Sequence, residues 1–162
     1  TDAQVNLILS WNFPLQIFRL AGIYSNEFNI LKRLKLGKVQ LINKKNHFFS
    51  RIHVEDIGNI LFKSISLFKN KEVYNICDDK PASQNDVVDY GVKLLKIEKP
   101  SPIKLEEVES EMLKNFYQDS KKVDNKKMKF SFKYNSTSLS SEITRSQSGF
   151  IFIRFCIPFT AN

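Results

Sequence analysis

The segment from Leu15 to Tyr24 constrains the fold more than any other part of the sequence. It follows Pro14 directly and is apolar almost throughout, with Gln16 and Arg19 as its polar residues. A strand that is buried on both faces of a parallel sheet has this near-continuous apolar character. We therefore expect a parallel sheet, which needs helices to cover its faces.

Helical and extended patterns alternate along the rest of the chain. Ser83 is an expected helix N-cap with Asp86 three residues later, as in a capping box, and Gly37 is an expected C-cap. The expected helices cover residues 2–11, 29–38, 55–65, 84–95, 106–117 and 121–129, and the further expected strands cover residues 39–42, 48–54 and 72–77. This order predicts an α/β fold.

Composition removes several classes of protein. The only histidines are His47 and His53, and Cys77 and Cys156 lie far apart, so we expect neither a metal site nor a disulfide framework. No apolar run approaches the roughly 20 residues of a membrane helix, and we expect a cytoplasmic protein. The net charge of +8 is spread along the chain without an arginine-rich run, which favours a solvated surface over a nucleic-acid site.

Four segments, in this order, carry a family resemblance. They are Phe18–Tyr24 (FRLAGIY), Phe49–Ile57 (FSRIHVEDI), Glu72–Asp79 (EVYNICDD), and the set Asn115, Phe116, Tyr117, Lys122, Val123 and Asn125. Together they resemble the extended short-chain dehydrogenase/reductase family, in its NAD-dependent epimerase/dehydratase branch of nucleoside-diphosphate-sugar enzymes. The resemblance implies the C-terminal part of a Rossmann-like parallel sheet with a small substrate-side cap, over residues 1–134. Residues 135–162 lie outside it, as a Ser/Thr-rich and then apolar tail.

The resemblance also implies roles for individual residues. The implied positions are Gly22, Ile23 and Tyr24 beside an NAD(P) cofactor, Asn29, Arg51 and Tyr117 beside a sugar-nucleotide-like substrate, and His53 and Asp56 in structural roles. It assigns no catalytic residue and no metal ligand within this chain.

Departures from the family pattern lower the expected activity. No GxxGxxG loop occurs, and the family's reacting Tyr–Lys pair lies upstream of the Leu15 strand, so we expect this chain to lack it. Residues 25–29 read Ser-Asn-Glu-Phe-Asn where the family has Gly-Pro-Gly-Arg-Asn, and Phe49 stands where relatives have a phosphate-binding Arg. We therefore predict a substrate-binding fragment that is inactive alone and that associates with itself or with a complementing N-terminal Rossmann half.

Two other interpretations stay open. One is a non-catalytic interaction module that uses the basic surface, and the other is a decayed gene product without a present function. The change of composition after Tyr134 is also typical of an added segment or of sequence read in a changed frame.

Overall fold

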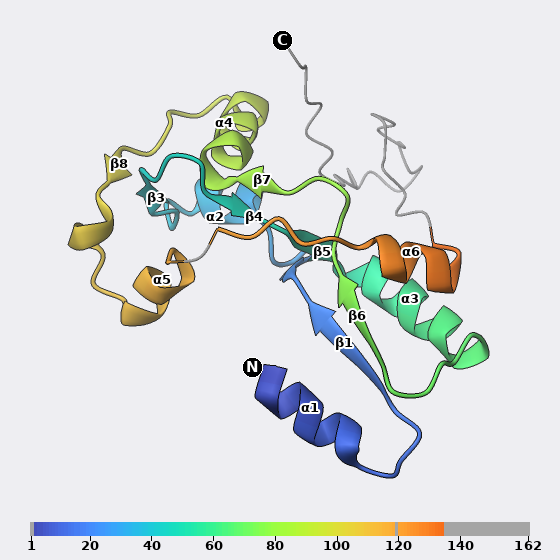
Figure 1. The fold of residues 1–162 in the computed structure, drawn as a ribbon. Helices are drawn as coiled ribbons and strands as arrows, with labels where there is room; N and C mark the ends of the chain where they lie inside the picture. The colour runs from blue at the N-terminus through green and yellow to red at the C-terminus, as the bar shows by residue number, and fades with distance from the viewer. Residues whose placement is uncertain (1, 119, 135–162) are drawn as a thin grey trace, which may run out of the picture.

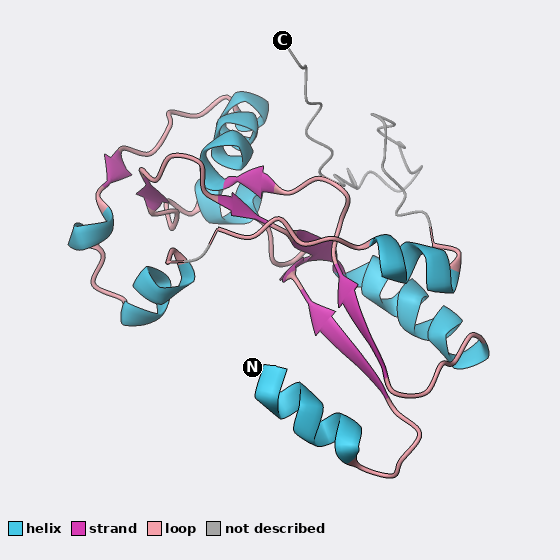
Figure 2. Cartoon of the chain, in the orientation of Figure 1, coloured by secondary structure: helices cyan, strands magenta, loops and turns pink. Residues whose placement is uncertain are grey.

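The computed structural model of the chain describes residues 2–118 and 120–134 (Figure 1). The tail predicted for residues 135–162 lies outside the described residues. Helices and strands alternate along the described chain (Figure 2). The helices are α1 (Asp2–Ser10), α2 (Ile30–Lys35), α3 (Val54–Ser66), α4 (Gln84–Leu95), α5 (Glu111–Phe116) and α6 (Lys126–Phe132), with a 3-10 turn at Leu105–Glu107. The strands are β1 (Gln16–Leu20), β2 (Gly22–Tyr24), β3 (Leu41–Ile42), β4 (Phe48–Phe49), β5 (Arg51–His53), β6 (Glu72–Ile76), β7 (Ala82–Ser83) and β8 (Pro102–Ile103).

Three of the four strand pairs are parallel, which confirms the predicted α/β fold. β1 pairs with β6, β2 with β5, and β3 with β8 in parallel, whereas β4 and β7 pair antiparallel. The single apolar strand expected over residues 15–24 is divided into β1 and β2 at Ala21. The Ala21 N–H donates to the carbonyl of Ile76, after which the chain pairs with β5 in place of β6.

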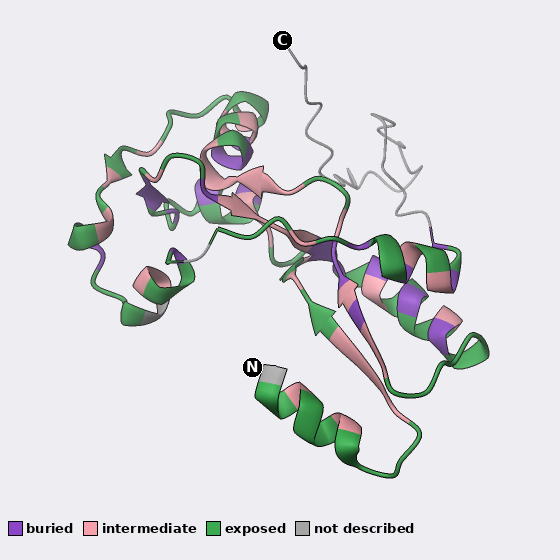
Figure 3. Ribbon diagram, viewed as in Figure 1, coloured by how far each residue is buried: buried purple, intermediate pink, exposed green. Residues whose placement is uncertain are grey.

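The largest core lies where α3 and α6 cover β6. Its buried residues are Ile52, Ile60, Tyr74, Ile76, Met128, Phe132 and Tyr134. The rings of Phe18, Tyr74 and Phe132 contact one another, with the Tyr74 centroid 5.8 Å from Phe18 and 4.6 Å from Phe132, and 6.1 Å between the two Phe rings. Buried residues of α3, α6 and β6 are purple in Figure 3, and they pack together in this core, as expected for helices that cover a sheet with one face.

A second group of elements lies on the other side of the molecule in Figure 1, and it has two smaller cores. α2 and α4 pack together over β3, around Leu34, Val39, Leu41 and Val88. Ile42, Val108 and Tyr117 form the other core, beside α5 and β8. α2, α4 and α5 of this second group contribute residues to the candidate site.

Two expected helices have wrong bounds. Val108 is buried and extended, so the helix expected from residue 106 begins only after Ser110, whose Oγ accepts the N–H of Leu113. The helix expected over residues 121–129 begins at Lys126, and residues 120–125 form a strap that is neither helix nor strand. The strap binds the sheet through the N–H of Lys121 to the carbonyl of Phe48.

Local capping signals are confirmed. The Ser83 side chain accepts the N–H of Asp86, and the Asp86 carboxylate accepts the N–H of Ser83, which completes a capping box at the start of α4. Gly37 has a φ of +63° just after α2, in the left-handed region that a glycine adopts readily. It allows the N–H of Lys38 to reach the carbonyl of Arg33.

Candidate functional site

An open cavity of about 610 Å³ is bordered by β2, α2, α4, α5 and the start of β5. It brings together the six residues that were predicted to contact cofactor or substrate: Gly22, Ile23, Tyr24, Asn29, Arg51 and Tyr117. These residues are spread over almost a hundred positions of sequence, so their meeting is a property of the fold. The two residues predicted to be structural, His53 and Asp56, do not line the cavity.

Tyr24 stands at the end of β2, where ligands bind in open α/β sheets. Its hydroxyl donates to Oδ2 of Asp78 at 3.1 Å, and its ring meets the His53 ring edge-on at 5.0 Å between centroids. These contacts fix the phenol between the carboxyl ends of β5 and β6. Ile23 is exposed beside it and offers an apolar surface to the cavity.

Arg51 is the cation at the inner wall. Its Nη1 donates to the carbonyls of Phe49 (3.2 Å) and Ala82 (3.1 Å), and no carboxylate of the described residues forms an ion pair with it. Burial lowers the pKa of the guanidinium, against smaller opposing effects of Tyr117, Tyr24 and Asp78. A partly buried cation whose hydrogen-bond partners among the described residues are neutral carbonyls favours an incoming anion.

Tyr117 forms the floor between two rings. It is 3% exposed, stacks on His47 at 4.9 Å between centroids, and meets Phe49 edge-on at 5.3 Å. Burial raises the pKa of Tyr117 to about 12. The phenol therefore stays protonated near neutral pH and is suited to donating a hydrogen bond, not to taking up a proton.

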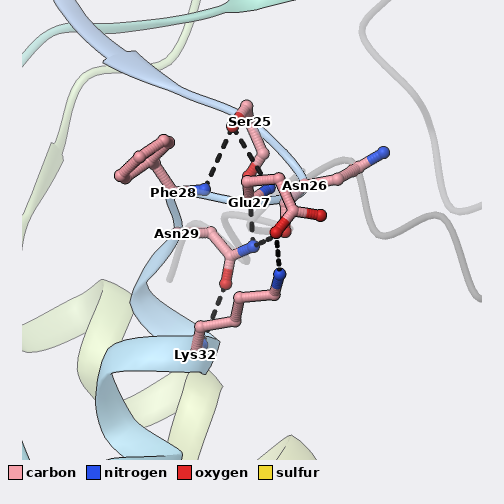
Figure 4. A network of polar contacts seen from close by, with 6 residues as sticks. All are labelled: Ser25, Asn26, Glu27, Phe28, Asn29 and Lys32. Carbon is pink, nitrogen blue, oxygen red and sulfur yellow. Dashed lines mark hydrogen bonds and ion pairs between the residues drawn. The ribbon is translucent and has the colours of Figure 1, made fainter.

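The loop before α2 is closed by its own side chains (Figure 4). Ser25 Oγ accepts the N–H groups of Glu27 and Phe28. The Asn29 amide donates to the carbonyls of Ser25 and Asn26, and its oxygen caps α2 by accepting the N–H of Lys32. Asn29 thus lines the cavity while its amide holds the loop.

His53 and Asp56 lie at the start of α3. His53 is its N-cap, and its Nδ1 accepts the N–H of Glu55 at 3.3 Å. Asp56 is 4% exposed and accepts a hydrogen bond from the Tyr134 hydroxyl. Both residues therefore have contacts that hold α3 in place, and their predicted structural roles stay predictions.

Sequence reasoning missed an aromatic wall. Phe49 and Phe116 stack with centroids 4.7 Å apart and planes 7° apart, and both line the cavity. In the sequence, Phe49 belongs to the segment Phe49–Ile57 and Phe116 precedes Tyr117, but neither pattern predicts that the two rings stack. Phe49 lies on β4 and Phe116 on α5, far apart in the sequence, so no local pattern reveals their contact.

Tyr117 and Lys121 have the Tyr-x-x-x-Lys spacing of the family's reacting pair, although we expected no such pair in this chain. The spacing brings two side chains together only within a continuous helix. Here α5 ends at Phe116, and Lys121 belongs to the strap on β4. The high pKa of Tyr117 is also the opposite of what activation by a Lys requires.

The described residues fit only one side of an NAD(P) site. Gly22 and Ile23 offer apolar contact, but the diphosphate of a dinucleotide needs a run of backbone N–H donors. The N–H groups of the loop at Glu27 and Phe28 are taken by Ser25.

Within residues 2–118 and 120–134, no cluster of three metal-ligating side chains occurs, and no helix is long and apolar enough to cross a bilayer.

Solved structures resemble this chain, whereas no protein-family model and no curated protein matches its sequence. A functionally unknown conserved protein from Silicibacter pomeroyi is 33% identical with a TM-score of 0.74, over 80% of this chain and 47% of that chain. dTDP-glucose 4,6-dehydratase from Bacillus anthracis, solved in complex with NAD, is 16% identical with a TM-score of 0.63, over 82% of this chain and 43% of that chain.

A third similar structure is UDP-glucose 4-epimerase from Thermotoga maritima, solved with UDP-glucose. It is 15% identical with a TM-score of 0.58, over 80% of this chain and 43% of that chain. This chain therefore spans less than half the length of each of these three proteins. At the identities of the two enzymes, the likeness concerns the fold.

Proposed function

We propose, from the premise that this chain has the fold of the NAD-dependent epimerase/dehydratase family, that it forms the substrate-binding side of a sugar-nucleotide oxidoreductase. The observation that carries the proposal is the cavity. Six residues chosen from the family resemblance line one space of about 610 Å³. Its size lies in the ordinary range for small-molecule sites.

The proposal gives each group of cavity-lining residues a role in binding. Gly22, Ile23 and Tyr24 would contact the edge of the cofactor, and Arg51 would bind an anionic group of the substrate. Tyr117 would donate a hydrogen bond from its protonated hydroxyl, and Asn29 would shape the entrance. The NAD(P) cofactor would supply the hydride chemistry when bound, and its diphosphate would be held by a separate Gly-rich half.

The 162-residue chain is accordingly proposed to be inactive alone. Residues 1–134 would form the substrate-side unit, with residues 135–162 as an off-family tail. The partner would be an N-terminal Rossmann half that completes the sheet, or a second copy of the chain. Among the described strands β1 pairs only with β6, and this edge and the exposed apolar side chains of β1 and α1 support an association of this kind.

The test is a calorimetric titration of the purified chain with UDP-glucose, NADH and NADPH, alone and mixed with an N-terminal Rossmann half encoded nearby. We expect weak binding of UDP-glucose by the chain alone, and binding of a dinucleotide only in the mixture. Binding of NADH by the chain alone would contradict the proposal that a separate N-terminal half binds the dinucleotide. A chain that binds no sugar nucleotide in either state would contradict the substrate role, and a salt-sensitive affinity for nucleic acid would favour the interaction module.

A further inference from the structure

Arg51 has unused donors, and none of the described residues forms an ion pair with it. Only its Nη1 donates to described residues, to the carbonyls of Phe49 and Ala82. Nε and Nη2 remain for a ligand, and these two atoms form one edge of the planar guanidinium. Such an edge binds one phosphate or carboxylate through two parallel hydrogen bonds.

The other two cations of the cavity wall are already engaged. Lys32 Nζ lies 2.5 Å from Glu27 Oε2, and Arg33 Nη2 donates to the carbonyl of Lys38 at 3.3 Å. Both side chains are also exposed, so water screens their charge. Glu27 itself lines the cavity and brings a negative charge to it. This carboxylate disfavours a second phosphate in the same cavity.

The backbone of the entrance loop also offers little to a second phosphate. Ser25 Oγ accepts the N–H groups of Glu27 and Phe28, and Asn29 Oδ1 accepts the N–H of Lys32 (Figure 4). A nest of backbone donors around an anion requires these groups to be free. The loop has instead closed on its own side chains.

The stacked pair Phe49 and Phe116 provides an aromatic surface in the cavity that Arg51 also lines. The Arg51 guanidinium carbon lies 5.7 Å from the centroid of the Phe49 ring. Phe116 stacks on Phe49 and is still 57% exposed. Planar rings stack favourably on such aromatic surfaces.

We propose that the cavity takes a ligand that combines one anionic group, held by Arg51, with a planar ring stacked at Phe116, and that it does not select for a diphosphate. The inference rests on the proposed function in using the same cavity, and it narrows the substrate class. The anionic group of this ligand is a phosphate or a carboxylate. The ring is a nucleobase or another aryl group.

The experiment is isothermal titration of the full chain with phenyl phosphate, benzoate, UMP and UDP. UMP should bind within about threefold of UDP, because the second phosphate gains no contact. Arg51→Gln should weaken the binding of phenyl phosphate and UMP by at least about tenfold. The matched control Arg33→Gln, which removes the other arginine of the wall, should leave both affinities within about twofold.

A second variant guards against a folding defect, since Arg51 also holds two carbonyls. Phe116→Ala removes an exposed ring and should weaken phenyl phosphate about tenfold, with an unchanged far-ultraviolet circular dichroism spectrum. The tighter of phenyl phosphate and benzoate identifies the anionic group.

The outcomes separate the two proposals. UDP that binds more than about tenfold tighter than UMP, with loss in Arg33→Gln, would overturn the inference and leave the proposed function standing. Binding of phenyl phosphate or benzoate through Arg51, without binding of UMP or UDP, would support the inference and overturn the sugar-nucleotide function. A chain that binds none of the four probes would overturn both.

Discussion

At the scale of single residues, the Asp56–Tyr134 hydrogen bond connects the two helices of the main core. Asp56 lies in the first turn of α3, and Tyr134 follows α6. Both side chains are buried, at 4% and 6% exposed. A buried carboxylate needs its donors, because desolvation without them costs more than the bond gains.

Tyr134→Phe should therefore lower the free energy of unfolding by about 1–3 kcal/mol, since the carboxylate loses a buried donor. Tyr74→Phe is the matched control. The Tyr74 hydroxyl is buried in the same core and has no hydrogen-bond partner among the described residues. Its removal should be neutral or slightly stabilising. Urea denaturation of both variants checks the pair, and equal losses would mean that the Asp56 contact contributes nothing.

The Cys77 thiol is expected to make the stability of the fold depend on pH. Burial raises the pKa of its thiol to about 11 from 9.0, with further contributions from the carboxylates of Asp78, Asp79 and Asp124. The folded state thus favours the neutral thiol, while the unfolded thiol ionises from pH 9.0 upward. The contribution to stability is complete below pH 9.0 and is lost as the pH rises toward 11.

In a Cys156→Ser background, iodoacetamide at pH 9 should accordingly alkylate folded Cys77 at least about 50-fold more slowly than the denatured chain. Mass spectrometry over time gives both rates. A folded-state rate close to the denatured rate would show that the thiol is neither buried nor shifted.

At the scale of helices and strands, two glycines inside helices differ in what surrounds them. A Cβ at Gly91 would lie 2.6 Å from Leu34 Cδ1, so this glycine lets α4 approach α2 closely. A Cβ at Gly58 on the exposed face of α3 would meet nothing within 4 Å.

Gly58→Ala should raise the free energy of unfolding by about 0.5–1 kcal/mol, because alanine loses less conformational freedom in a helix. Gly91→Ala gains the same helix-propensity stabilisation, but its Cβ must displace Leu34. Overpacking of this kind costs about 1–3 kcal/mol, so the variant should lose about 1 kcal/mol of unfolding free energy in net terms. Thermal denaturation of the two variants measures the difference. Stabilisation by both would mean that Leu34 moves aside freely.

The sequence predicted best those elements whose signals come from neighbouring residues. The capping box at Ser83 and the left-handed Gly37 depend on neighbours within a few residues, and both are confirmed. The helices expected over residues 106–117 and 121–129 depend on distant partners. Val108 is held extended in a core with Ile42, and the strap is held by Phe48 and Ser50, which no local pattern reveals.

The candidate site also has one part that the sequence predicted and one part that it did not. The family resemblance selected residues such as Tyr24, Arg51 and Tyr117, which do line one cavity. The Phe49–Phe116 stack and the engagement of Asn29 by its own loop follow from three-dimensional contacts. Their consequence for ligand choice was therefore beyond sequence reasoning.

At the scale of the whole molecule, β1 has one strand partner. Among the described strands it pairs with β6 only, and Leu20 on β1 and Trp11 after α1 are 45% and 52% exposed. An open edge with apolar side chains promotes pairing with another chain.

The sedimentation coefficient should therefore rise with protein concentration, and Leu20→Lys should shift the equilibrium toward monomer by adding charge at this edge. Phe62→Lys is the control, because Phe62 is 75% exposed on α3, away from β1. A chain that stays monomeric at every concentration, or an equal effect of both variants, would argue against association through β1.

The strap of residues 120–125 couples the two groups of elements mechanically. It follows α5, which carries Phe116, contacts Phe48 of β4 and Ser50, and is anchored by Asn125 to the carbonyl of Cys77. The strap thus links the cavity wall to the main core. Loosening that core would release the wall, so the affinity for ligand and the resistance of the core to unfolding should vary together.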